Sequence, residues 1–314
     1  MKYGFTLPGR GPLATPENLG IIARHGEELG CFCLMASDHI VVPREISSTY
    51  PYTEGGEFPG SVTGESMEQL TVLAFLAGQT KTIKLGTSVM IVPHRNPIVA
   101  AKALATLDVL SNGRLTLGVG VGWMEEEFLA LDAPPFAERG AVTDEYLMAF
   151  KELWTSDNPT FNGKYYQFSD ISFLPRPVQK PHPPIWVPGS GSLETWDWTI
   201  QNDYVYCYLS YFGYKRGIDV MNGFWKKMEE LGVDDNPYRA GFLQLVCVAE
   251  TDEKAKELYE EHVDYFYKKC LHVYEGFAEA PGYRTIRTIK SGALAQVGAA
   301  ASRFRQRLTW EDYI

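Results

Sequence analysis

The sequence has few cysteines, no long apolar run and little positive charge. The five cysteines among 314 residues are scattered, and none forms a CxxC pair. This spacing favours reduced thiols over a disulfide framework or a cysteine zinc site. No run approaches about eighteen apolar residues, and the start of the chain lacks the apolar region of a signal peptide. We therefore expect a cytoplasmic protein with no membrane segment and no metal centre.

The net charge of −10 at pH 7 indicates which partners the chain avoids. A negative surface repels the phosphates of nucleic acids and anionic membranes, so neither is expected as the main partner. An anionic ligand would need a local site with its own donors. The composition, 45% hydrophobic and 22% charged, is that of a soluble globular protein, and the length suits two small domains or one α/β barrel with insertions.

Extended and helical patterns alternate along the chain. Short apolar runs read as strands, and helical segments follow most of them. The runs are continuous rather than alternating in polarity, so both faces of each strand are expected to be buried. A parallel sheet covered by helices has this pattern, in a (β/α)8 barrel or in a doubly wound sheet. The predicted strands are residues 2–7, 32–36, 83–92, 114–121, 185–188, 203–209 and 241–249.

Three glycines help to choose between these architectures. Gly118, Gly120 and Gly122 lie at the end of the fourth predicted strand, but their GxGxG spacing is not the GxGxxG of a dinucleotide-binding turn. No acidic residue closes a next strand, so the doubly wound sheet is disfavoured. In a barrel, glycines at the carboxyl end of a strand let a flat ring approach the backbone. Close packing explains these glycines equally well.

The expected fold is an α/β (β/α)8 TIM barrel that forms one domain over residues 1–314. A closed barrel needs eight strands, and residues 285–314 show no strand pattern. We therefore expect the sequence to stop short of the eighth strand. Insertions in the barrel are expected at about residues 43–65, 123–182 and 258–300.

A glycine–serine loop follows the fifth predicted strand. The apolar run 185–187 stops at Pro188, and a helical segment starts soon after it. Such a loop points backbone N–H groups and the positive end of a helix dipole at one place, which suits the phosphate of a cofactor. An ordinary turn with Ser192 as the helix cap explains the loop equally well. The loop residues are Gly189, Ser190, Gly191 and Ser192.

Several segments, taken in order, resemble the bacterial-luciferase-like family of flavin- and deazaflavin-dependent oxidoreductases. Together they cover most of residues 1–257. The resemblance implies a (β/α)8 barrel with an isoalloxazine-type ring at its carboxyl-terminal mouth, and a homodimer. The segments are SDHIVVP (37–43), LGTSVMIVPHRNP (85–97), LDVLSNGRLTLGVGVGW (107–123), FAERGAVTDEYL (136–147), LPRPVQKPHPPIWVPGSGS (174–192) and VAETDEKAKE (248–257).

The resemblance places a catalytic histidine at His39, beside the ring. An imidazole titrates near neutrality, so it can give or take a proton at an oxygen-bearing group. The neighbouring Asp38 is expected to orient it. Bacterial luciferase has a glutamate and a second histidine on either side of this histidine, whereas this chain has Asp38 and Ile40, closer to the deazaflavin-dependent relatives.

Further cofactor contacts follow from the same resemblance. Ser88 and Val89 match a position where relatives carry a non-prolyl cis peptide that supports the ring. Gly120 and Val121 fall where luciferase has a reactive cysteine and a phosphate-binding arginine. Their loss argues against light-emitting aldehyde chemistry and places the phosphate on Gly189–Ser192.

Other polar and aromatic residues have simpler interpretations. Arg95 is expected in a surface ion pair, and Glu125–Glu127 in a solvated first helical turn. Aromatic residues between 196 and 214 can line a pocket or belong to the core. In the loop 43–65, substrate contacts are expected from Tyr50, Tyr52 and Phe58.

The sequence thus predicts a luciferase-like monooxygenase that uses reduced FMN and oxygen on a small organic substrate, with a separate flavin reductase as partner. One alternative is a hydride-transfer oxidoreductase that uses the deazaflavin coenzyme F-420. An alternative of another class is a barrel that binds flavin without catalysis. A phosphosugar aldolase or isomerase is disfavoured, because the strand ends show no convincing lysine or paired carboxylates.

Overall fold

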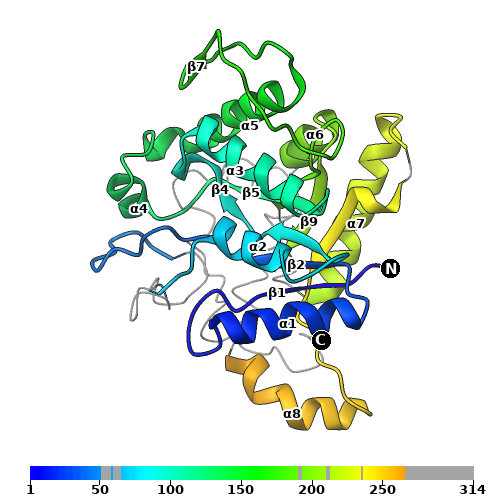
Figure 1. The fold of residues 1–314 in the computed structure, drawn as a ribbon. Helices are drawn as coiled ribbons and strands as arrows, with labels where there is room; N and C mark the ends of the chain where they lie inside the picture. Colours follow the sequence, from blue (N-terminus) through cyan, green and yellow to red (C-terminus); the bar gives the residue numbers. More distant parts are fainter. Residues whose placement is uncertain (51–57, 59–64, 190–192, 210–212, 235, 266–314) are drawn as a thin grey trace. The chain divides into compact units, whose positions relative to one another are not determined.

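The computed structural model describes residues 1–50, 58, 65–189, 193–209, 213–234 and 236–265 (Figure 1). The chain divides into two compact units. The first consists of Met1–Ile46 and Gly60–Trp186, and the second of Ser47–Pro59 and Val187–Ile314. The expected single barrel domain stays a prediction. The tail in which no eighth strand was expected lies outside the described residues.

A parallel sheet forms the centre of the first unit. Its strands are paired in the order β1-β2-β3-β5-β8, and β4 pairs with β5. Leu85 of β3 lies between Leu34 of β2 and Leu115 of β5, and all three are fully buried. The continuous apolar runs therefore mark strands buried on both faces, as predicted. The strands are β1 (Gly4–Thr6), β2 (Cys33–Ala36), β3 (Lys84–Thr87), β4 (Met90–Ile91), β5 (Leu115–Gly120) and β8 (Ile185–Gly189), which continues into the second unit.

The helices of the first unit begin at residues that cap them. The Thr15 side chain accepts a hydrogen bond from the Asn18 N–H, and Asn96 accepts one from the Ile98 N–H. A proline follows each cap, at the position where its missing N–H costs nothing. The elements are α1 (Pro16–Glu28), α2 (Gln69–Ala77), η1 (Val92–His94), α3 (Pro97–Leu110), α4 (Glu125–Ala130), η2 (Phe136–Glu138) and α5 (Arg139–Thr155).

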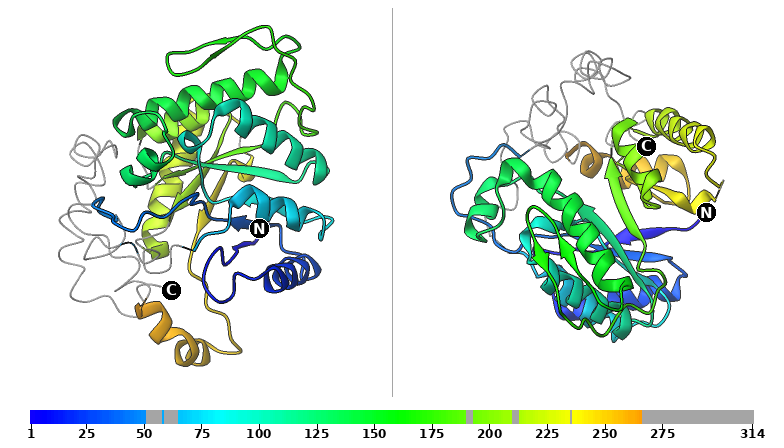
Figure 2. Two further views of the ribbon diagram at one scale, coloured as in Figure 1. Left: turned by 60° about the vertical axis from the view of Figure 1, so that its left-hand side comes forward. Right: turned by 90° about the horizontal axis from the view of Figure 1, so that it is seen from above.

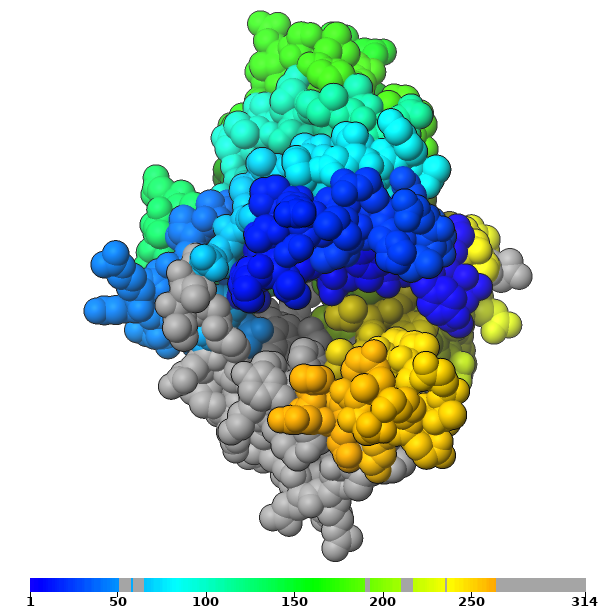
Figure 3. All heavy atoms as spheres, turned by 60° about the horizontal axis from the view of Figure 1, so that its bottom comes forward, coloured from blue at the N-terminus to red at the C-terminus, as the bar shows by residue number. Residues whose placement is uncertain are grey.

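Neighbouring helices pack in sequence along the outside of the first unit. Figure 2 shows α3 and α5 side by side, and α2 lies next to α3. Helix α1 (blue) lies beside the cyan segment that contains α2 on the face drawn in Figure 3. This alternation of strands and covering helices is the βα repeat of a TIM-barrel-like α/β fold.

A polar hairpin extends from the first unit after α5. It consists of β6 (Phe161–Asn162) and β7 (Gln167–Phe168), which pair antiparallel. The buried Glu145 carboxylate accepts hydrogen bonds from three successive backbone N–H groups, those of Lys164, Tyr165 and Tyr166, at 2.7, 2.8 and 2.8 Å. One side chain of α5 thus holds the turn of this hairpin.

The second unit contains the parallel strand pair β9–β10 and an aromatic core. Strand β9 (Val205–Leu209) pairs with β10 (Ala240–Leu243), and the Tyr206 ring stacks on Phe224 at 4.9 Å between ring centroids. Trp196, Tyr206 and Tyr208 are buried in this core, so packing accounts for these aromatic residues. The helices are α6 (Leu193–Gln201), α7 (Gly213–Glu230), η3 (Pro237–Arg239) and α8 (Asp252–Tyr265). No helix in the described part of the chain is both long and apolar enough to cross a membrane.

Candidate active site

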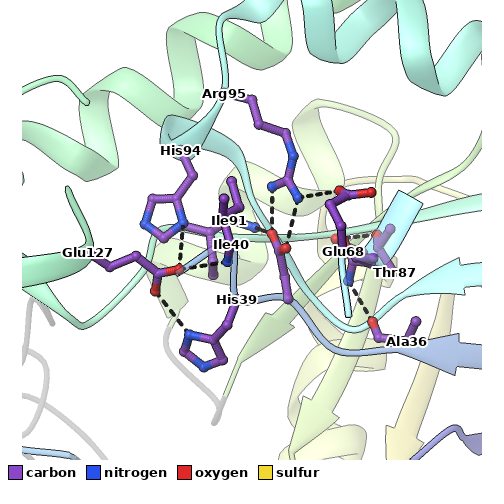
Figure 4. A network of polar contacts seen from close by, with 12 residues as sticks. Ala36, His39, Ile40, Glu68, Thr87, Ile91, His94, Arg95 and Glu127 are labelled. Atoms are coloured by element: carbon purple, nitrogen blue, oxygen red, sulfur yellow. Dashed lines mark hydrogen bonds and ion pairs between the residues drawn. The ribbon is translucent and has the colours of Figure 1, made fainter. Parts of the chain in front are cut away.

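Polar side chains gather where β2 and β4 end in the first unit (Figure 4). Asp38 and His39 follow β2, while His94 and Arg95 follow β4 by way of η1. Helix α4 contributes Glu127. In parallel α/β folds, ligands bind at the carboxyl ends of the strands, so a catalytic site is expected at this edge.

His39 and Glu127 form a buried, hydrogen-bonded histidine–carboxylate pair. The Nδ1 atom of His39 lies 2.9 Å from Oε2 of Glu127, and the two side chains are 12% and 1% exposed. The other carboxylate oxygen, Oε1, accepts hydrogen bonds from the Ile40 and Val41 N–H groups at 2.8 and 3.3 Å. Glu127 therefore holds both the imidazole and the backbone that carries it.

The Glu127 carboxylate is stabilised in its ionised form. Burial alone would raise its pKa, but the hydrogen bond and the charge of His39, the charge of His94 and the Ile40 N–H outweigh burial and lower it. An ionised carboxylate only accepts hydrogen bonds, so Nδ1 of His39 must donate. In the neutral imidazole the basic nitrogen is then Nε2.

The position of Glu127 corrects the interpretation of the triple glutamate as a solvated helical turn. Glu127 is buried, and Phe128 beside it is buried too. Its partner His39 lies 88 positions away in the sequence, so no local pattern indicates the contact. Sequence reasoning misinterpreted Glu127 and missed His94, Glu68 and Trp123.

Asp38 belongs to a second group of charges. Its carboxylate accepts two hydrogen bonds from the Arg95 guanidinium, at 2.7 and 2.8 Å, and one from the Ile91 N–H at 2.9 Å. Arg95 also donates to Glu68 at 2.9 Å. Asp38 thus pairs with Arg95, and the carboxylate that orients His39 is Glu127.

The burial of Arg95 corrects its expected place in a surface ion pair. The Arg95 side chain is 11% exposed and that of Asp38 is 0% exposed. Burial alone would lower the pKa of Arg95, but its hydrogen bonds and ion pairs with Asp38 and Glu68 raise it. For Glu68, hydrogen bonds from Thr71 and Arg95 overcome the effect of burial and lower the pKa.

The predicted ring-supporting segment lies in the same unit. The peptide bond between Ser88 and Val89 is cis, as the resemblance implies. The predicted strand 83–92 is therefore two strands, β3 and β4, separated at this bond. The role of Ser88 and Val89 in holding a cofactor stays a prediction.

The glycines of β5 allow close packing between strands. A Cβ added to Gly118 would lie 2.1 Å from the Thr87 carbonyl oxygen, and one on Gly120 would lie 2.4 Å from Cγ2 of Val89. Thr87 also donates a hydrogen bond to the Gly118 carbonyl at 2.7 Å. Packing thus requires glycine at both positions, while cofactor contacts from Gly120 and Val121 stay predictions.

The residues near His39 include an aromatic neighbour absent from the sequence predictions. The ring of Trp123 lies edge-to-face with His39 at 6.5 Å between ring centroids. Trp123 follows Gly122, whose φ of +86° is the left-handed backbone that favours glycine. Trp123 thus adds an apolar surface to the surroundings of the imidazole.

The predicted phosphate loop belongs to the second unit. The Gly189 carbonyl accepts a hydrogen bond from the Tyr206 hydroxyl at 3.0 Å. Ser190, Gly191 and Ser192 lie outside the described residues, so phosphate binding there stays a prediction. Of the predicted substrate contacts, Tyr50 and Phe58 meet edge-to-face at 5.2 Å, and Tyr52 lies outside the described residues.

The βα-repeat fold, with an imidazole–carboxylate pair at its strand ends, agrees with the class of α/β oxidoreductases that the sequence resembles. The chain belongs to the luciferase-like monooxygenase family, whose sequence model matches residues 1–308.

Curated relatives of the chain use two kinds of cofactor, according to their names. The F420-dependent glucose-6-phosphate dehydrogenase of Amycolatopsis mediterranei is 36% identical over 57% of this chain and 49% of its own length. The FMNH(2)-dependent dimethylsulfone monooxygenase of Pseudomonas putida is 37% identical over 39% of this chain and 34% of its own length. The alignments thus span about half of the first relative and about a third of the second. Both relatives are oxidoreductases by name, and they place the chain in this class.

Two solved structures, a monooxygenase and a coenzyme F420-dependent reductase, have the same fold as this chain. The monooxygenase RslO1 of Streptomyces bottropensis matches 98% of this chain and 84% of its own, with a TM-score of 0.66 and 21% identity. The coenzyme F420-dependent tetrahydromethanopterin reductase of Methanopyrus kandleri matches 96% and 82%, with a TM-score of 0.63 and 16% identity. These likenesses confirm the TIM-barrel-like luciferase fold.

Proposed function

We propose that this chain is a flavin-dependent monooxygenase that acts on a small organic substrate with reduced FMN and oxygen. The observation that carries the proposal is the buried His39–Glu127 pair at the end of β2. An imidazole whose Nδ1 is held by an ionised carboxylate is suited to move protons at Nε2. The sulfone monooxygenase relative supports the choice of FMN.

His39 and its neighbour Trp123 suit a flavin-type ring, because they combine an imidazole with an apolar surface. When bound, the flavin would supply the reaction with oxygen. The chain would orient the imidazole through Glu127 and give or take a proton at Nε2 of His39. Ser88, Val89, Gly120 and Val121 would lie along the ring, and Gly189–Ser192 would hold the phosphate.

A separate flavin reductase would supply the reduced FMN. The flavin-dependent trigonelline monooxygenase of Acinetobacter baylyi, 37% identical over 37% of this chain and 32% of its own length, is named as an oxygenase component. By analogy, this chain would be the oxygenase half of a two-component system. We also retain the homodimer as part of the proposal.

A second candidate is hydride transfer with the deazaflavin coenzyme and no oxygen. The longer alignment with the F420-dependent dehydrogenase favours it, since it covers more of the chain than the alignment with the FMN enzyme. The same His39–Glu127 pair would then handle the proton that accompanies hydride transfer. A barrel that binds flavin without catalysis is the remaining alternative.

An anaerobic titration separates the two cofactors. The purified chain is titrated with FMN and with the deazaflavin coenzyme, each oxidised and reduced, and binding is followed by fluorescence. Tight binding of reduced FMN supports the monooxygenase, and preference for the deazaflavin overturns it. If neither cofactor binds, the glycine–serine loop is only a helix cap.

Turnover is then assayed on substrates drawn from the chemistry of the relatives. A sulfone and a pyridinium carboxylate are tested with reduced FMN and oxygen, and glucose 6-phosphate with the deazaflavin. Oxygen incorporation into any of the first group is the expected result. Deazaflavin reduction by the sugar phosphate would establish the second candidate instead.

A further inference from the structure

We propose that His94 is a positioning residue that holds Glu127 from the side opposite His39, by donating its Nδ1 proton to Oε1 of the carboxylate. Figure 4 shows the two imidazoles on different sides of Glu127. Nδ1 of His94 lies 3.8 Å from Oε1, while His39 engages Oε2. Each carboxylate oxygen thus faces one histidine.

His94 is almost completely buried. Its side chain is 2% exposed, and neither ring nitrogen has a hydrogen-bond partner among the described residues. Buried polar atoms in native proteins are almost always paired, because leaving one unpaired loses the hydrogen bonds it makes with water in the unfolded chain. The nearest strong acceptor is Glu127, and a movement of roughly 1 Å brings Nδ1 within hydrogen-bond distance.

The charges around His94 indicate that it acts as a neutral donor. Burial lowers its pKa to about 4, although Glu127 from α4 and Asp38 from the segment after β2 favour the charged form. Arg95 and His39 oppose that form. A neutral imidazole beside an ionised carboxylate presents its N–H to the acceptor, and here the nitrogen that faces Glu127 is Nδ1.

A metal ion does not explain the arrangement. Within the part of the chain that the structure describes, no group of three or more histidine, cysteine, aspartate or glutamate side chains is arranged to hold one.

The ring of Phe128 packs edge-to-face on His94 at 4.7 Å and gives the imidazole an apolar wall. His94 therefore faces Glu127 from a buried position with an aromatic ring against it, where a hydrogen bond is stronger than in water.

The first test reads the proton on His94 directly. Long-range proton–nitrogen NMR spectra of protein labelled with 15N-histidine are recorded above neutral pH, and His94→Asn assigns the His94 signals among the six histidines. We expect the Nδ1–H tautomer. The Nε2–H tautomer would overturn the proposal. This test needs neither cofactor nor substrate, so it stands even if the proposed function fails.

The second test reads the consequence for turnover, which rests on the proposed function. Asn places an amide near the position of Nδ1, Gln places one near Nε2, and Phe keeps the ring without a donor. We expect kcat to fall about tenfold in His94→Phe and His94→Gln, to stay within about threefold in His94→Asn, and KM to change little. Equal losses in all three variants would show packing alone.

An exposed histidine provides the matched control. His25 on α1 is 68% exposed and pairs with Glu28. His25→Phe makes the same chemical change outside the site, so kcat should stay at the wild-type value. A loss equal to that of His94→Phe would show that the substitution acts through general stability.

Discussion

Two buried carboxylates near the same strand ends have different partners. In the Arg95 cluster (Asp38, Glu68 and Arg95), Asp38 accepts two hydrogen bonds from a guanidinium. In the His39 cluster (His39, His94 and Glu127), Glu127 faces two imidazoles. Both carboxylates also accept backbone N–H groups, so their local anchoring is similar.

The difference lies in what each partner can do. A guanidinium keeps its charge at every pH of interest and fixes a carboxylate in one geometry. An imidazole can lose or gain a proton near neutrality. We infer that the Arg95 cluster stabilises the fold and that the His39 cluster serves the reaction. Substitutions in each cluster should therefore affect different properties of the protein.

The largest effect is expected from removing the imidazole of the His39 cluster. His39→Ala should lower turnover by about 10²- to 10⁴-fold, because a positioned acid–base group contributes that much. Cofactor affinity, measured by fluorescence titration, should stay within a few-fold of wild type. A fully active His39→Ala variant would contradict the assignment, and a variant that loses cofactor binding would make His39 a binding residue.

The next largest effect concerns the Arg95 cluster. Arg95→Leu leaves Asp38 buried without its cation, so the free energy of unfolding should fall by about 3–5 kcal/mol in urea titrations. Arg239→Leu is the control, because Asp203 and Asp234, the partners of Arg239, are 78% and 55% exposed. That change should cost about 1 kcal/mol or less. Equal losses would remove the distinction between buried and exposed pairs.

The pH dependence of stability should show the buried His94. Its pKa falls from 6.5 to about 4 on folding. Between these values the unfolded chain binds more protons, so lowering the pH through this window should reduce the free energy of unfolding by about 2–3 kcal/mol. His94→Phe should remove this loss, whereas His25→Phe should keep it. An unchanged slope in His94→Phe would show that other groups cause it.

Glu68 should give the smallest effect. It belongs to the Arg95 cluster, but its side chain is 40% exposed. Glu68→Gln should lower the free energy of unfolding by about 1 kcal/mol or less, since solvent screens its pairing with Arg95. Thermal and urea unfolding measure the change. A loss as large as that of Arg95→Leu would mean that Glu68, and not Asp38, is the main partner of the guanidinium.

Much of the fold could be predicted because buried strands leave a local signal. The apolar runs 32–36, 114–121 and 185–188 correspond to β2, β5 and β8 within a residue or two. The run 241–249 was too long, since β10 ends at Leu243 and the following residues include the exposed Val246 and Val248. Apolar character alone does not distinguish these exposed residues from a buried strand.

The site was only partly predictable. His39 could be found because it stands just after a strand and in a segment that resembles a known family. Glu127 could not, because a run of three glutamates looks like a solvated turn until the fold brings it to His39. Arg95 was misplaced for the same reason, since its partner Asp38 comes from another strand end.

The tautomer of His39 in Glu127→Gln tests the central claim most directly. Oε1 accepts two backbone N–H groups, so the glutamine carbonyl must take that place, and its NH₂ group must face Nδ1 of His39. The carboxylate requires a proton on Nδ1, whereas the amide requires an acceptor there. Long-range proton–nitrogen NMR should therefore show Nδ1–H in the wild type and Nε2–H in Glu127→Gln. The same tautomer in both proteins would contradict the account.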